Sequence, residues 1–388
     1  MSLEATIARW LSHPGDLGAL PGDDAVLAQT PVLRHLAAAL PGSAHTAVDL
    51  LHKRAPAFTD APDPFPLFRA ERAVHASLKV PTSSSDLRIL TLNVALLDRT
   101  YLMTRVRMPE YPRRRAMMWE TLLTDDWDVL LLQEVWEDAD IAELTAAGQR
   151  YGYRVWGGTT ANHHRHGLAI AVRSSRFREA GDTRGEGLFQ TRHRLEQSPG
   201  PDVWRGWISW RLLLAETGLP VHLLTTHMAP FAAFWPFRRA QARELGSRIR
   251  SLPADDVVVL GGDTNAGPWY QDDTWTQHGG RVVANIWADT ASYALLRHYG
   301  ELQDAAVLGG LGLAPDEGIT ATDANSLHAR SYLGEEPPAR MDLLLMRGDV
   351  ARVTRAEVVY RQRVDHGPAG HFELSDHYGV GISLALPA

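Results

Sequence analysis

Polar side chains stand at the ends of several apolar runs, and their types suit the hydrolysis of a phosphate ester. The clearest case is "VVVLGGDTNAGPW", residues 257–269, in which Asp263 and Asn265 follow four apolar residues and two glycines. Two residues apart on an extended segment, these side chains point the same way. The pair could orient a water molecule and bind the charge that develops on phosphorus. The alternative is that both are only turn residues.

Five further runs carry polar residues that could bind a metal ion or transfer a proton. Glu134 can bind a hard divalent cation, and Asn93 can add a neutral oxygen ligand or donate to a phosphate. His227 and His377 titrate near neutrality and suit acid and base roles, and Asp342 could orient one of them. These positions, with their neighbours, are Asn93, Gln133–Glu134, Thr226–His227, Asp342 and Ser375–Asp376–His377.

Each of these residues alone has a structural explanation, such as capping a turn or satisfying a buried partner. Together they mark six strand ends, which is where α/β folds place their sites. The chain has no cysteine, so disulfides and thiolate metal ligands are excluded. Any metal must therefore have oxygen or nitrogen ligands, which favours Mg²⁺, Mn²⁺ or Ca²⁺ and leaves Zn²⁺ possible through histidine.

The charge pattern argues modestly against a nucleic-acid substrate. The formal net charge is −7 over 388 residues, and a net acidic chain is not a natural binder of polyanions. A basic cluster, "RVRMPEYPRRRAMM" at 105–118, favours a solvated helix face with its approach loop. The histidines of "NHHRH", 162–166, could suggest zinc, but a polar loop entering a strand is favoured because carboxylate partners and helical spacing are missing.

The elements that must position these residues fall into two parts. Residues 1–85 carry helical spacing and a Pro-rich connector, and they predict a helical N-terminal extension. From 86 to 388 the pattern predicts one α/β domain with buried strands and outer helices. The expected strands span 87–97, 127–136, 167–174, 207–215, 221–229, 256–262, 340–348 and 378–386, and the expected helices span 112–126, 138–152 and 237–253.

The N-terminus indicates a cytoplasmic protein. Residues 1–16 contain the acidic Glu4 and no basic region followed by an apolar run, so we expect no signal peptide. No stretch reaches the roughly 20 apolar residues of a membrane span. Peripheral contact with a membrane stays open, and the sequence indicates no obligate protein partner.

In order, "LNV", "LQEVW", "THMA", "GGDTNAGP", "RMD" and "SDH" resemble the motifs of the endonuclease/exonuclease/phosphatase superfamily. The resemblance covers about residues 86–387 and implies the DNase I-like fold, a four-layer sandwich of two packed β-sheets flanked by helices. Three features resemble the magnesium-dependent neutral sphingomyelinase branch: Val135–Trp136, Thr226–Ala229 and "RAQARELGSRI". Two departures are Thr264, where many members have a large apolar residue, and His166, where lipid-cleaving relatives often have Ser.

The resemblance also implies the role of each site residue. Glu134 and Asn93 would hold Mg²⁺, with Mn²⁺ as a substitute, and Asp376 would support the metal region. Asp263, Asn265 and His377 would surround the nucleophilic water or a second ion. His227 would contact the phosphate or protonate the leaving oxygen, and Asp342 would pair with His377.

The substrate class stays open among three hypotheses. The first is a phospholipase C-like phosphodiesterase acting on sphingomyelin or a related lipid. The second is a nuclease or a nucleotide or inositol phosphate phosphohydrolase, and the third is a binding module, which the intact polar set argues against. The aromatic residues that follow His227 could contact a membrane, pack on the N-terminal extension or form a wall for a ligand; they are Phe231, Phe234, Trp235 and Phe237.

Overall fold

The structure is a computed structural model of the whole chain. The part that it describes comprises residues 86–101, 104–157, 166–191, 205–230, 234–268, 291–311, 318–322, 324–327, 339–348 and 352–386. The predicted N-terminal extension, residues 1–85, lies outside this part. No helix among the described residues is long and apolar enough to cross a membrane.

The first sheet carries the strands that hold Asn93 and Glu134. Its central pair, β1 (Leu87–Leu96) and β4 (Val129–Val135), is parallel and almost fully buried. Such continuous apolar runs are expected of strands that are covered on both faces. The remaining strands pair antiparallel, in the order β13-β16-β1-β4-β6-β5: β13 (Arg352–Val359), β16 (Gly379–Ala385), β6 (Ala169–Arg173) and β5 (Tyr153–Gly157).

The second sheet carries the strands that end at His227 and Asp263 and the strand that begins at Asp342. Its parallel pair is β9 (Pro220–His227) and β10 (Val257–Asp263). The other strands pair antiparallel, in the order β11-β12-β10-β9-β8-β7: β11 (Gln303–Asp304), β12 (Asp342–Arg347), β8 (Gly206–Leu214) and β7 (Phe177–Leu188).

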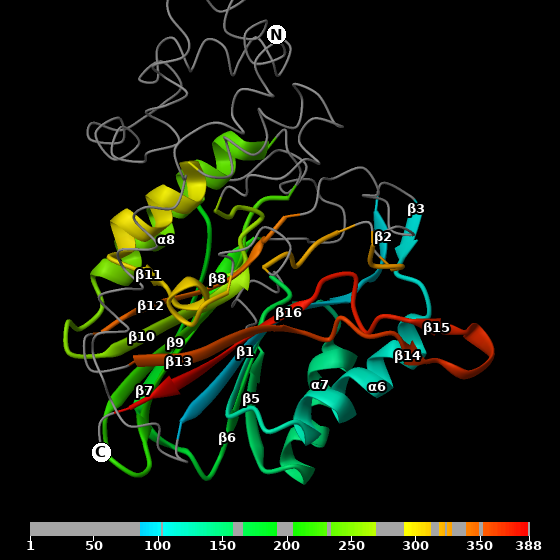
Figure 1. Ribbon diagram of the computed structural model, residues 1–388, viewed down its shortest axis with the longest axis horizontal. Helices are drawn as coiled ribbons and strands as arrows, with labels where there is room; N and C mark the ends of the chain where they lie inside the picture. The colour runs from blue at the N-terminus through cyan, green and yellow to red at the C-terminus, as the bar shows by residue number, and fades with distance from the viewer. Residues whose placement is uncertain are drawn as a thin grey trace, which may run out of the picture.

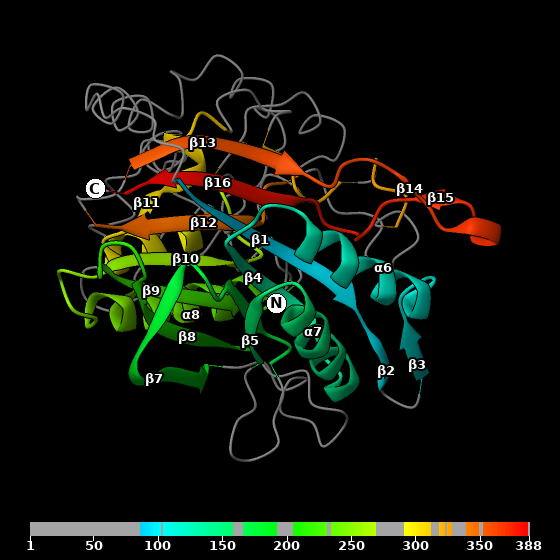
Figure 2. The same ribbon diagram turned by 90° about the horizontal axis from the view of Figure 1, so that it is seen from below.

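The two sheets pack face to face and bury the main core between them. Ile89 and Leu131 of the first sheet share one fully buried cluster with Leu223 and Val259 of the second. A Cβ on Gly261 would lie 2.6 Å from Leu131 Cδ1 and 3.0 Å from Thr91 Cβ, so glycine here lets β10 approach the first sheet closely. Figures 1 and 2 show the two sheets lying against each other.

Helices cover the outer faces of both sheets. On the first sheet, α6 (Tyr111–Thr124) and α7 (Asp138–Arg150) bury Met118, Leu122 and Leu144 against Leu90 and Leu132. On the second sheet lie α8 (Trp235–Arg250) and the helical residues 291–300, which meet at Gly246 and Tyr299 (Figure 1). The predicted two-sheet sandwich with outer helices is therefore confirmed.

Smaller elements complete the described part. Two hairpins project from the sandwich. The first pairs β2 (Asp98–Tyr101) with β3 (Thr104–Arg107). The second pairs β14 (Val364–Asp365) with β15 (His371–Phe372), and the short helix η6 (Gly367–Ala369) connects its two strands. Helix α11 (Ala305–Leu308) follows β11 directly. Both hairpins lie on the same side of the molecule in Figures 1 and 2.

Candidate active site

The strand register places three of the predicted site residues in one row across the second sheet. Asp263 pairs with His227 on one side and with Asp342 on the other. These residues end β9 and β10 and begin the antiparallel β12, so their side chains gather at one edge. In the first sheet Asn93 pairs with Gln133, directly before Glu134. The facing edges of the two sheets therefore meet at the site.

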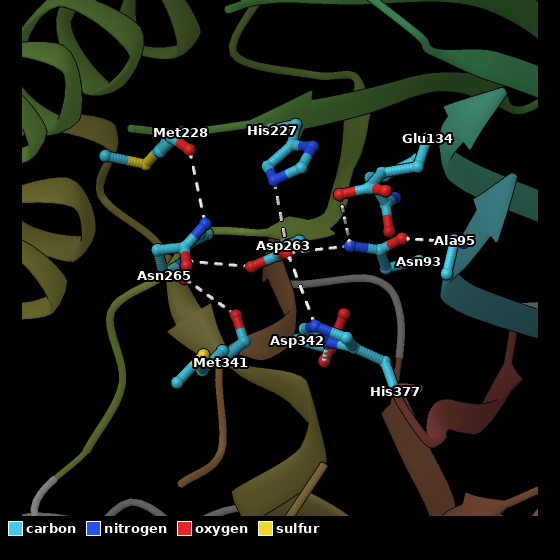
Figure 3. Close-up of polar contacts among 12 residues, drawn as sticks. Asn93, Ala95, Glu134, His227, Met228, Asp263, Asn265, Met341, Asp342 and His377 are labelled. Atoms are coloured by element: carbon cyan, nitrogen blue, oxygen red, sulfur yellow. Dashed lines mark hydrogen bonds and ion pairs between the residues drawn. The ribbon is translucent and has the colours of Figure 1, made fainter. Parts of the chain in front are cut away.

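The carboxylate of Asp263 lies at the centre of this junction (Figure 3). Asn93 Nδ2 donates to Asp263 Oδ2 at 3.0 Å, and His227 Nε2 lies 3.2 Å from the same oxygen. The backbone N–H of Asn265 donates to Oδ1 at 3.0 Å. Burial alone would raise the pKa of Asp263, but the charges of His227 and His377 and the hydrogen bonds from His227 and Asn93 hold it below its ordinary value. Asp263 therefore stays ionised over the whole neutral range.

His377 forms a buried pair with Asp342. His377 Nδ1 lies 2.8 Å from Asp342 Oδ2, and His377 Nε2 faces Asp263 Oδ2 at 3.9 Å. Burial alone would lower the pKa of His377, but the carboxylates of Asp342 and Asp263 raise it well above its ordinary value. The imidazole is therefore held in its protonated form, between two carboxylates that it can bridge.

The region of Glu134 offers oxygen ligands suited to a hard cation. Glu134 is half-buried at the end of β4 and accepts from Asn93 Nδ2 at 3.3 Å. The Asn93 amide oxygen accepts from Ala95 N–H, so the amide nitrogen faces the two carboxylates. Asp376 is buried beside His377, and both Asp376 and Glu134 act electrostatically on the guanidinium of Arg114. The carboxylates of Glu134 and Asp263 are oxygen ligands of the kind that Mg²⁺ or Mn²⁺ binds, whereas Asn93 turns toward them its amide nitrogen, which cannot bind a cation.

A second group of ligand atoms lies close together within the described residues. Asp263, Asp342 and His377 each offer one atom, and these atoms lie within 4.8 Å of one another. A protonated imidazole cannot bind a cation, so His377 would have to lose its proton before it could act as a ligand. The Glu134 region and this group are therefore both candidate metal sites.

Two of the strand ends adopt left-handed backbone conformations that aim their side chains into the site. Glu134 has φ of 60° and Asn265 has φ of 47°. For a glutamate this conformation costs of order 1–3 kcal/mol, and such outliers cluster at functional sites. Asn265 tolerates the conformation more easily, and its Nδ2 donates to Met228 O at 3.2 Å. Asp263 and Asn265 thus satisfy both alternatives, because they form a turn and also lie on either side of the site.

Gln133 has a structural role. Its Nε2 donates to Thr91 Oγ1 at 3.1 Å and to Thr225 Oγ1 at 2.8 Å. These hydroxyls belong to β1 and β9, so the amide joins the two sheets one step below the site. Thr226 also bonds within the sheet, to Gly206 O.

Several residues that support the site were not predicted. Arg114 is fully buried and donates to the carbonyls of Val94, Ala95 and Leu374, at 2.8 to 3.0 Å. The interpretation of residues 105–118 as a solvated face is therefore wrong for Arg114, although its neighbour Arg113 is exposed. Burial lowers the pKa of Arg114 to about 10. Its position in an amphipathic helix was the available signal, since it falls on the same face as Met118 and Leu122.

Trp136 and Arg205 extend the site beyond His227. The Trp136 ring centroid lies 6.4 Å from that of His227, and the Arg205 guanidinium lies 5.6 Å over the Trp136 ring. Arg205 directly precedes Gly206, which pairs with His227 in the sheet register. His166 is fully buried near Glu186, so the polar loop expected at 162–166 ends in a buried side chain. Residues 162–165 lie outside the described part.

The predicted aromatic contact is described only in part. Phe231 and the side chain of Trp235 lie outside the described residues. Phe234 precedes α8, and its ring meets Phe237 edge-on at 6.2 Å. Contact of these residues with a membrane or with the N-terminal extension stays a prediction.

Comparison with solved structures finds the same fold in several enzymes at low sequence identity. D. rerio TDP2 complexed with a single-strand DNA product is 20% identical with a TM-score of 0.53, over 78% of this chain and all of that chain. Beta toxin from Staphylococcus aureus is 14% identical with a TM-score of 0.53, over 76% and 99% of the two chains. Bacteroides thetaiotaomicron mannosyl-6-phosphatase is 17% identical with a TM-score of 0.51, over 77% and 100%.

No curated protein matches the chain in a sequence search. The profile of the endonuclease/exonuclease/phosphatase family matches residues 90–377, which include every predicted site residue from Asn93 to His377. The chain therefore belongs to the endonuclease/exonuclease/phosphatase family, whose enzymes hydrolyse phosphate esters.

Proposed function

We propose that the chain is a phosphodiesterase that uses Mg²⁺, with Mn²⁺ as a substitute, and hydrolyses its substrate by attack of water. The observation that carries this proposal is the ionised Asp263 carboxylate, which contacts Asn93, His227 and Asn265 where the two sheets meet. Preorganised donors around a fixed anion are what in-line attack on phosphorus requires.

In this mechanism Asp263 orients the attacking water and accepts its hydrogen bond. Its lowered pKa makes it a weak base, so the carboxylate first acts by position and charge and takes the proton of the water only as the new oxygen–phosphorus bond forms. The protonated His377 stabilises negative charge on the phosphorane, and Asp342 holds its ring. His227 is placed to donate to the leaving oxygen. A bound Mg²⁺ at Glu134 would supply Lewis-acid polarisation of a phosphate oxygen.

We further propose that the substrate is a phospholipid, cleaved as by a phospholipase C, with sphingomyelin as the first candidate. This proposal rests on the resemblance of "RAQARELGSRI" to the sphingomyelinase branch. Gln241 of that segment accepts through Oε1 from Ala229 N–H, and Arg238, the residue directly before the segment, donates through Nη1 to Ala229 O. Both bonds hold the chain directly after His227. Peripheral contact of Phe231, Phe234, Trp235 and Phe237 with a lipid surface would accompany this substrate.

The test is hydrolysis by the purified full-length chain across substrate classes. Sphingomyelin and phosphatidylcholine vesicles, a single-stranded oligonucleotide, a nucleotide diester and an inositol phosphate would each be assayed with Mg²⁺ and with excess EDTA. We expect release of phosphocholine that requires Mg²⁺. If only the oligonucleotide or the inositol phosphate is cleaved, the proposal of a phospholipid substrate is refuted, whereas the proposed metal-dependent mechanism stands. Full turnover in EDTA would refute the metal-dependent mechanism.

Glu134→Gln tests the position of the metal. The variant keeps the size of the side chain and removes one negative charge, so we expect more Mg²⁺ to be needed for half-maximal activity. We also expect a loss of about 10² or more in kcat, the scale seen when a preorganised electrostatic group is removed. Glu137→Gln, a change three residues further along the chain at the start of α7, is the matched control.

A further inference from the structure

Thr320 lies at the point where the two partners of the buried Asp342–His377 pair enter the site. The residue is fully buried, in the short described segment 318–322. Its backbone N–H donates to Ala339 O at 3.0 Å, and its backbone carbonyl accepts from Tyr378 N–H at 2.8 Å. The next residue, Ala321, forms isolated bridges with both Ala339 and His377. The segment therefore joins the chain that precedes Asp342 to the chain that carries His377.

The hydroxyl of Thr320 is fully engaged around Asp342. Its oxygen accepts from Met341 N–H at 3.1 Å and from Asp342 N–H at 3.2 Å. A hydroxyl oxygen has two acceptor lone pairs, so both are used and its own proton must point elsewhere.

The Asp342 carboxylate itself is held by His377. Its Oδ2 lies 2.8 Å from His377 Nδ1, whereas Oδ1 is buried and has no hydrogen-bond partner among the described residues. The Thr320 hydroxyl therefore acts on Asp342 through the backbone amides of Met341 and Asp342, which set where the Asp342 side chain leaves the chain.

We propose that Thr320 is a positioning residue for catalysis, which fixes the backbone at Asp342 so that the carboxylate holds the His377 imidazole toward Asp263. The proposal rests on the proposed function, because it gives His377 its role in the reaction. The hydroxyl of Thr320 holds the first residues of β12, and its backbone holds Ala339 on one side and Tyr378 on the other. One buried residue thus fixes the two chain segments that carry Asp342 and His377, and with them the direction of the ring.

The test uses two substitutions of similar size. Thr320→Val removes the hydroxyl and keeps the branched shape, and Thr320→Ser keeps the hydroxyl and loses a methyl group. Thr322→Val is the matched control, because among the described residues the hydroxyl of Thr322 bonds to Ala324 N–H, within the same loop. For each, kcat, KM, the thermal unfolding midpoint and the downfield proton NMR line of the His377 Nδ1–H would be measured. The absence of that line from His377→Ala assigns it.

We expect Thr320→Val to lower kcat by about 10- to 100-fold per folded molecule, the range found when residues that orient an active-site ligand are removed. KM should change little, and the His377 line should shift or broaden. Thr320→Ser should restore both kcat and the line, and Thr322→Val should resemble the parent. In a His377→Ala background, Thr320→Val should cost almost nothing more, because the effect passes through that ring.

Normal kcat and an unchanged His377 line in folded Thr320→Val would overturn the proposal, as would an equal loss in the His377→Ala background. If Thr320→Val does not fold, Thr320→Ala takes its place in every comparison. If the parent chain hydrolyses no phosphodiester, the proposed function fails, while the NMR line still reports whether Thr320 fixes the ring.

Discussion

At the scale of single residues, Asp263 and His377 act as one unit. The pKa of Asp263 lies below its ordinary value and that of His377 well above, so each stabilises the charged form of the other. Removing one partner already destroys the arrangement. We therefore expect Asp263→Asn and His377→Ala each to lower kcat by about 10³ or more, from the size of acid–base and electrostatic effects combined.

The double variant distinguishes this unit from two independent residues. It should be little worse than either single variant, because groups that act together are strongly non-additive. The kcat per folded molecule and a thermal melt would be measured for all three. A stable His377→Ala enzyme with near-normal turnover would show instead that His377 is a structural histidine.

A second prediction at this scale concerns the dependence of stability on pH. Burial lowers the pKa of His166 to about 4 from its ordinary 6.5. Between these values the unfolded chain binds a proton that the folded chain does not, so stability falls as the pH drops. From pH 7 to pH 5 this one residue should cost about 2 kcal/mol.

Denaturant unfolding of His166→Gln at both pH values checks this. The pH dependence of the free energy of unfolding should be smaller than in the parent by about that amount. His222 has a pKa lowered to about 4 in the same way and should account for a comparable share. His371→Gln, at an exposed position, is the control. An unchanged pH dependence in His166→Gln would show that His166 is solvated.

The sequence predicted the residues to which we assign the chemistry, which the structure brings together, but not those that hold them in place. Asp263 and His377 could be found because burying a charged group at the end of an apolar strand costs free energy unless the group has a partner. Such residues therefore stand out in the sequence. Thr320 and Arg114 bond to backbone carbonyls and amides, which every residue has. The partner of Arg114 at Leu374 is 260 positions away, and no local pattern specifies such a pairing.

At the scale of elements, helix α8 holds the end of β9. Gln241 Oε1 accepts from Ala229 N–H at 2.8 Å, and Gln241 Nε2 donates to Thr191 O at 3.0 Å. One amide thus joins the segment after His227 to the segment after β7. Gln241→Ala should lower kcat by about 10-fold or more, because a displacement of about 1 Å at a reacting group can cost about 100-fold.

The loss of both hydrogen bonds should also reduce the free energy of unfolding by about 1–3 kcal/mol, the cost of leaving a buried polar group unpaired. Steady-state kinetics and denaturant unfolding measure the two effects. Arg250→Ala is the control on the same helix, since its pair with Glu301 is largely exposed and such pairs contribute little. An unaltered kcat in Gln241→Ala would show that α8 does not position His227.

The central elements were predictable, whereas the edge strands were not. The predicted helices at 112–126, 138–152 and 237–253 correspond to α6, α7 and α8 within a few residues. The strands β7 and β13 read "FREAGDTRGEGL" and "RVTRAEVV". Both are terminal strands of their sheets, where charged residues protect the free edge. That protection removes the apolar run by which strands are recognised.

At the scale of the whole molecule, the site exists only because the two sheets are held at a fixed separation. Asn93 and Asp263 bond across the gap between β1 and β10. Two residues earlier on each strand, Thr91 lies against Gly261, with Leu131 of β4 beside them. Because side chains on one face recur every second residue, this contact lies directly below the hydrogen bond between Asn93 and Asp263.

Adding a methyl group at Gly261 should therefore force the sheets apart beneath the site. The Cβ of Gly261→Ala would lie 2.6 Å from Leu131 Cδ1 and 3.0 Å from Thr91 Cβ. We expect a loss of about 1–3 kcal/mol in stability from overpacking. We also expect a lower kcat per folded molecule, because the Asn93–Asp263 bond is stretched.

Leu131→Ala alone should leave a cavity and cost about 2–5 kcal/mol. In the double variant the new methyl group occupies the vacated space, so both stability and kcat should exceed the additive expectation. Thermal melts and kinetics of the four proteins measure this, and strictly additive losses would show that the separation of the sheets does not control the site.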